Sequence, residues 1–156
     1  VEGVYAVGDC TGKLMLAHTA YREAEVAVNH MAGKEDKMDY SVISSVIYTN
    51  PEVASVGETE ESAAQKGMNV KVVKAPMMFS GRYVAEVTRG EGFVKLVYDV
   101  DKECLVGVHI VGSYASEMIY GCAIMLQKKM PLEELKTLVF PHPSVCEVIR
   151  EGLFMF

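Results

Sequence analysis

The chain has 156 residues, half of them hydrophobic, and its formal net charge at pH 7 is −6. This length suits one ordinary domain with a buried core and is too short for two large ones. The chain lacks the excess of Lys and Arg that nucleic acid binding requires, and no apolar run reaches the ~18 residues of a membrane span, so we expect neither nucleic acid nor a membrane as a partner.

The first 33 residues predict one strand and one long helix. The strand runs from Val4 to Val7 and is followed by the turn-forming pair Gly8-Asp9. Apolar residues three and four apart predict a helix from Leu14 to Ala32, which Gly33 ends. A lone strand cannot satisfy its own edges. We therefore expect the last piece of a domain whose earlier part is missing, and a chain start that is cut.

The segment from Gly33 to Ser41 is charged, has no apolar periodicity and reads as a linker. Beyond it, two short β-rich runs flank Asn50-Pro51, and a short helix capped by Thr59 follows. Next come three strands, of which the second and third form a hairpin, and then three helices, the last capped by Ser144. In sequence these are VKVVKAPMMF, FVKLVYDV, CLVGVHIVG, SYASEMIYGCAIMLQKK, MPLEELKTL and SVCEVIREG. The order predicts an α+β fold, an antiparallel sheet flanked by helices.

The four cysteines form no CxxC or CxxxxC pair; they are Cys10, Cys104, Cys122 and Cys146. We expect buried or free reduced thiols and neither a redox dithiol nor a metal site. Reduced thiols suit a bacterial cytoplasm and a mitochondrial matrix equally.

Asp9 follows the predicted strand, where ligands of open α/β sheets tend to bind, and its carboxylate could accept hydrogen bonds from ribitol-like hydroxyls. The start of the next helix, from Met15 to His18, would offer backbone N–H donors to electron-rich ligand atoms. The alternative is that Gly8-Asp9 is an ordinary turn.

GVYAVGDC followed by MLAHTAYREAEVA resembles the closing FAD-binding segment of the pyridine nucleotide-disulfide oxidoreductases. Within that family, the tripeptide LAH favours a resemblance to the dihydrolipoamide dehydrogenase branch. YTNPEVASVG, GVHIVG, Ala115-Ser116-Glu117 and HPSVCE follow in the family's order. The resemblance implies an FAD-binding remnant at residues 1–39 and an interface domain at 40–156 that forms a homodimer. It also implies that FAD is bound by Asp9, Met15, Leu16, Ala17 and His18.

His142 lies between two prolines, five residues before Glu147. A histidine can exchange protons near neutral pH, and a carboxylate on its other ring nitrogen would fix the tautomer. The alternative is that His142 is an ordinary loop residue and that Glu147 only compensates the dipole of the helix that follows. The resemblance implies the family's acid-base pair, with carbonyl groups near His142 and Pro143 approaching the flavin of the partner subunit.

The sequence departs from the family's usual pattern at Ser144, where threonine is common, and at Cys146. His30 and His109 belong to no motif and are predicted to be surface or structural residues. The apolar run from Ile119 to Leu126 fits a dimer surface and ordinary core equally well.

The chain has no GxGxxG motif after a strand and no redox cysteine pair. By resemblance, the parent would be an FAD-dependent dihydrolipoamide dehydrogenase that reduces NAD. Its partner would be a lipoyl-bearing carrier protein of a 2-oxoacid dehydrogenase or glycine cleavage complex.

We expect no activity from the isolated chain. The alternatives are a non-catalytic dimerisation or binding module, and a related reductase that acts on another thiol.

Overall fold

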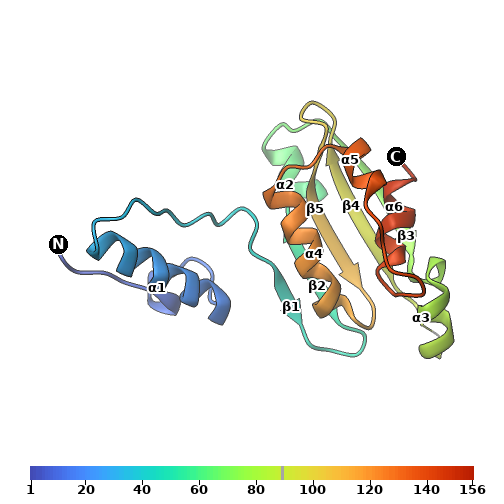
Figure 1. Ribbon diagram of the computed structural model, residues 1–156, viewed down its shortest axis with the longest axis horizontal. Coiled ribbons are helices and arrows are strands. Elements are labelled where there is room, and N and C mark those ends of the chain that lie inside the picture. The colour runs from blue at the N-terminus through green and yellow to red at the C-terminus, as the bar shows by residue number, and fades with distance from the viewer. Residues whose placement is uncertain (89) are drawn as a thin grey trace. The chain divides into compact units, whose positions relative to one another are not determined.

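The computed structural model describes residues 1–88 and 90–156. The chain divides into two compact units, Val1–Ile43 and Ser44–Phe156, drawn in Figure 1. The assignment of residues 1–39 to an FAD-binding domain and of 40–156 to an interface domain stays a prediction.

The first unit is built around one helix. The 3-10 helix η1 (Gly8–Thr11) precedes α1 (Ala17–Met31), which begins three residues later than the sequence predicts. Gly33 has a φ of 70°, a left-handed conformation that glycine adopts without steric cost, and this ends the helix as expected. The predicted helix is therefore confirmed.

The predicted strand from Val4 to Val7 is wrong. These residues are irregular, and the side chains of Val4 and Val7 are 69% and 38% exposed. A strand needs a neighbour for its backbone N–H and C=O groups, and the described residues of this unit contain no other strand. Asp9 consequently lies in η1 and does not follow a strand.

The second unit contains a five-stranded antiparallel sheet in the order β1-β2-β5-β4-β3, which confirms the predicted α+β class. Asn50-Pro51 separates the first two strands, and β4 and β5 form the expected hairpin. The strands are β1 (Ser45–Ile47), β2 (Val53–Gly57), β3 (Val70–Pro76), β4 (Phe93–Asp99) and β5 (Cys104–Val111).

Helices cover one face of this sheet (Figure 1). Helix α4 (Ala115–Gln127) packs on β2 and β5, and α6 (Glu147–Leu153) packs on β3 and β4. Alternate strand residues are buried, as period-2 side-chain orientation requires; they include Ala54, Val56, Val94, Leu96, Val108 and Ile110. The other helices are α2 (Glu60–Gln65), η2 (Met77–Phe79), α3 (Gly81–Glu86) and α5 (Leu132–Thr137).

Helix α4 is mainly core. Ile119 and Leu126 are buried, whereas Tyr120 and Ile124 are 71% and 41% exposed. Most of the apolar run from Ile119 to Leu126 therefore packs in the core of the unit, and two of its large side chains face outward. Within the residues described, no helix is both long and apolar enough to cross a bilayer.

Candidate active site

His142 and Glu147 are joined by a hydrogen bond at the end of the chain. His142 lies in the loop after α5 and Glu147 opens α6, which brings Nδ1 of the imidazole within 2.8 Å of Oε1 of the carboxylate. The His142 side chain is 81% exposed and that of Glu147 is 22% exposed. The ring is therefore open to a reactant while its partner is partly shielded.

The second oxygen of Glu147 is also occupied, because Oε2 accepts the Ser144 backbone N–H at 2.9 Å. This N–H, followed by the bond to His142, lowers the pKa of the Glu147 carboxyl below its ordinary value. An ionised carboxylate only accepts hydrogen bonds, so Nδ1 of His142 carries the proton that is shared with it. Nε2 then has a free electron pair and can act as the base.

The prediction that Ser144 caps the last helix is wrong. Helix α6 follows Cys146 and has no side-chain cap. The Ser144 hydroxyl instead donates to the Pro141 carbonyl at 2.5 Å and lies 3.0 Å from the Cys146 sulfur. Ser144 therefore holds the loop closed on itself, and its N–H is bonded to the carboxylate of Glu147.

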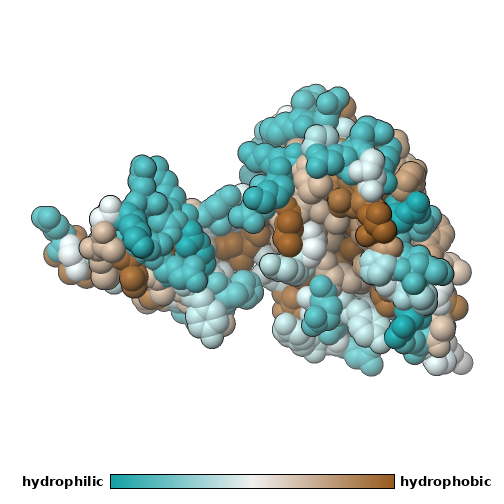
Figure 2. Space-filling model, viewed as in Figure 1, coloured by the Kyte–Doolittle hydropathy of each residue, from teal (hydrophilic) through white to brown (hydrophobic). Residues whose placement is uncertain are grey.

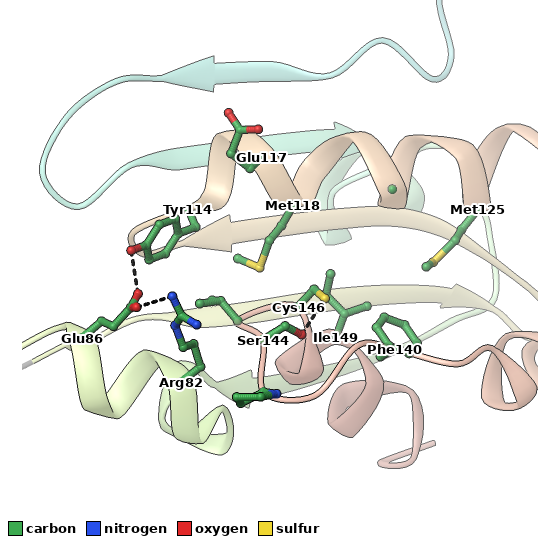
Figure 3. A pocket seen from close by; sticks show the side chains of 13 residues that line it. Arg82, Glu86, Tyr114, Glu117, Met118, Met125, Phe140, Ser144, Cys146 and Ile149 are labelled. Carbon is green, nitrogen blue, oxygen red and sulfur yellow. Dashed lines mark hydrogen bonds and ion pairs between the residues drawn. The ribbon is translucent and has the colours of Figure 1, made fainter.

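A groove of about 500 Å³ borders the loop. Figure 3 shows its two walls, one formed by the methionine side chains of α4 and the other by loop and α6 residues, and Figure 2 shows apolar surface along this face. At one end Tyr114 donates to Glu86 at 2.7 Å, and Arg82 forms an ion pair with the same carboxylate. The apolar lining includes Met118, Met125, Phe140, Pro143, Cys146 and Ile149.

We expect Glu147 to stabilise the fold in a pH-dependent way. Its pKa is lower in the folded chain than the ordinary 4.5, so its stabilising effect is complete above about pH 4.5 and disappears as the pH falls through the folded value. Thermal melting from pH 6 to pH 3 should therefore show the difference between the parent chain and Glu147→Gln shrinking below pH 4.5. Glu134→Gln in α5 corrects for the loss of one negative charge, and a difference that stayed constant with pH would contradict the assignment.

The predicted flavin-binding residues lie together in the first unit. Asp9 is exposed in η1, Leu16 precedes the first residue of α1, and Met15 is 67% exposed. Ala17 and His18 form the first turn of α1, which has no side-chain cap. An uncapped helix start can offer backbone N–H donors, and the Asp9 carboxylate can accept hydrogen bonds from hydroxyl groups. The chemistry of these residues is therefore compatible with a ligand that has an electron-rich ring and a polyol chain.

Glu23, which no motif in the sequence singles out, positions this turn. Its side chain is buried on α1; Oε2 accepts the Gly8 N–H at 2.6 Å, and Oε1 accepts the Tyr40 hydroxyl at 2.7 Å. The Gly8 N–H is the main cause that lowers the pKa of Glu23. The carboxylate thus fixes the residue before Asp9, and no motif in the sequence marked it.

The other histidines have local partners. His109 Nε2 lies 2.9 Å from the Glu58 carbonyl oxygen, and His30 Nδ1 lies 2.6 Å from the Tyr5 hydroxyl. The four cysteines are free thiols, with Cys104 and Cys122 buried. Burial raises the pKa of Cys122 to about 12, so this thiol stays protonated.

Comparison with known proteins gives a consistent result. Residues 43–153 match the family described as "Pyridine nucleotide-disulphide oxidoreductase, dimerisation domain". The mitochondrial dihydrolipoyl dehydrogenase of Pisum sativum is 40% identical over 97% of the chain and 30% of its own length. Leghemoglobin reductase of Glycine max is 38% identical over 97% of the chain and 29% of its length.

Among solved structures, LpdA from Mycobacterium tuberculosis matches with a TM-score of 0.88 at 27% identity, over 98% of the chain and 33% of that protein. The chain thus spans about a third of the length of the relatives it matches. The family match covers most of the chain, and the relatives cover nearly all of it. The chain therefore belongs to the pyridine nucleotide-disulphide oxidoreductases and carries their dimerisation domain.

Proposed function

We propose that this chain is the C-terminal part of an FAD-dependent dihydrolipoamide dehydrogenase, in which it supplies the subunit interface and an acid-base pair. The observation that carries the proposal is the hydrogen bond of 2.8 Å between His142 and Glu147, beside an exposed imidazole. The names of the relatives support the choice of reaction, and their greater length supports the view that other parts of the enzyme lie elsewhere in the polypeptide.

His142 moves the proton in this proposal. Only a thiolate attacks a disulfide, so one thiol of a dihydrolipoyl group must lose its proton before it attacks the redox disulfide, which another part of the enzyme would supply. Nε2 of His142 accepts that proton. The second thiol then loses its proton and displaces the enzyme sulfur, so the lipoyl disulfide forms and the enzyme disulfide is reduced to a dithiol. Glu147 stabilises the resulting imidazolium because its carboxylate remains on Nδ1. The net reaction converts the dihydrolipoyl group and NAD⁺ to the lipoyl group, NADH and H⁺.

The first unit would contribute to flavin binding. The start of α1 and Asp9 would hold the ring edge and the ribitol hydroxyls, respectively. Bound FAD supplies the electron-accepting group through which the two electrons pass to NAD⁺. In the proposed homodimer, His142 and Pro143 of one subunit approach the flavin of the other, so each active site needs two chains.

The substrate is proposed to be a dihydrolipoyl group on a carrier protein. The test uses the flavin-containing protein that carries this chain and follows NADH formation with dihydrolipoamide or with reduced glutathione. Turnover with dihydrolipoamide alone supports the proposal. Turnover with glutathione alone would indicate a related reductase for another thiol, and inactivity with both thiols would favour a non-catalytic dimerisation module.

A further inference from the structure

We propose that Ser80 is a positioning residue, whose buried hydroxyl holds the loop of His142 and Glu147 in its proton-transfer geometry. The inference rests on the proposed function for its catalytic meaning. Ser80 lies between η2 and α3, more than sixty residues before the loop, and its side chain is fully buried. The sequence predicted no element at α3, so nothing marked this serine.

The Ser80 hydroxyl acts both as a hydrogen-bond donor and as an acceptor. Its O–H group donates to the Ser144 carbonyl at 2.9 Å, and its oxygen accepts the Tyr83 backbone N–H at 3.1 Å. A hydroxyl carries one proton, and neither a carbonyl oxygen nor an amide N–H can exchange roles with it, so both directions are fixed. Ser80 thereby caps the start of α3 and ties that helix to the active-site loop.

The backbone of Ser80 is anchored as firmly as its side chain. Its N–H donates to the Met77 carbonyl at 3.0 Å, and its own carbonyl accepts the Val84 N–H at 3.2 Å. Tyr83, the residue whose N–H it accepts, is itself buried, with 1% of its surface exposed. The hydroxyl therefore projects from a fixed part of the core.

Ser144 passes this constraint to the proposed acid-base pair. Its carbonyl is held by Ser80, its N–H reaches Oε2 of Glu147 at 2.9 Å, and Oε1 of Glu147 reaches His142. Figure 3 shows the Ser144 loop beside α3. Four residues thus form a continuous series from a buried hydroxyl to an exposed imidazole. Without the Ser80 hydroxyl, the Ser144 carbonyl loses its anchor to the core. Only contacts within the loop, such as the bond from the Ser144 hydroxyl to the Pro141 carbonyl, then keep the Ser144 N–H directed at Glu147.

The test measures the Glu147 carboxyl by carbon-13 NMR titration of the 156-residue chain. Ser80→Ala should raise its pKa toward the ordinary 4.5, because the Ser144 N–H is the main cause of its depression. Ser80→Thr keeps the hydroxyl and should restore the parent value. In the flavin-containing protein, Ser80→Ala should lower kcat for dihydrolipoamide by roughly ten- to a hundredfold.

The matched control is Thr59→Ala. Thr59 caps α2 by accepting the Ser62 N–H at 3.1 Å and has no bond to the loop, so its loss weakens a cap without moving the Glu147 pKa. Should Ser80→Ala fold poorly, Ser80→Gly removes the hydroxyl at a smaller loss of capping. An unchanged Glu147 pKa in a folded variant without the hydroxyl overturns the inference. If Ser80→Ala shifts the Glu147 pKa but His142→Gln keeps full activity, Ser80 still anchors the loop, and the proposed function is overturned.

Discussion

Replacing His142 with glutamine should lower the rate of dihydrolipoamide-dependent NAD reduction by roughly 10²–10⁴-fold, the usual contribution of a positioned general base. The glutamine amide can still donate to the Glu147 carboxylate, so the loop should keep its shape, but the amide nitrogen cannot accept a proton. The measurement is the steady-state rate of NADH formation in the flavin-containing protein, with flavin content and thermal melting recorded alongside.

The control for this variant is His109→Gln. His109 lies on β5, and its Nε2 contacts the Glu58 carbonyl oxygen, away from the loop. Its replacement should leave the rate within a factor of two or so, as expected for a residue that touches no reactant. A normal rate for His142→Gln, with normal flavin content, would remove the proposed role of the imidazole.

Gly107→Ala should destabilise the second unit by about 3 kcal/mol, at the upper end of the cost of overpacking. Gly107 is buried on β5 opposite Gly57, and a Cβ there would lie 1.9 Å from the Glu58 carbonyl oxygen. This clash is with backbone, which cannot rotate away as a side chain can. Glu58 would have to move, which would break its N–H bond of 2.8 Å to Val106.

Gly121→Ala is the matched glycine substitution. A Cβ on Gly121 would have nothing within 4 Å, and the residue lies inside α4, where alanine favours the helix by about 0.5–1 kcal/mol. Urea unfolding followed by circular dichroism should therefore show opposite shifts of the midpoint for the two variants. Equal stability of Gly107→Ala and the parent would show that β5 and Glu58 lie farther apart than described.

Much of the second unit is readable from sequence because its signals are local. Alternating apolar residues mark β4 and β5, and Thr59 with the following acidic turn marks α2. Helix α3 could not be predicted from the sequence because its six residues show no clear apolar period and its start depends on the hydroxyl of Ser80. The Val4 to Val7 prediction failed because a strand depends on a neighbour, which local propensity does not reveal.

The candidate site was partly visible in the sequence. His142 and Glu147 stand five residues apart at a loop-to-helix junction, so their meeting could be foreseen, and the hydrogen bond between them is present. Their wider setting could not be foreseen. The Ser80 contact joins residues 64 positions apart, and Glu23 reaches Gly8 across 15 positions. Such bonds depend on how elements pack, which no single segment encodes.

The most direct test of the central claim is the mass and visible absorption spectrum of the native protein that an antibody against this chain detects in its source cell. We expect a polypeptide about three times larger than this 17.1 kDa chain, by comparison with its relatives, and a yellow protein with flavin absorbance. A colourless native protein of about 17.1 kDa would contradict the proposed enzyme and favour a dimerisation module that acts without flavin.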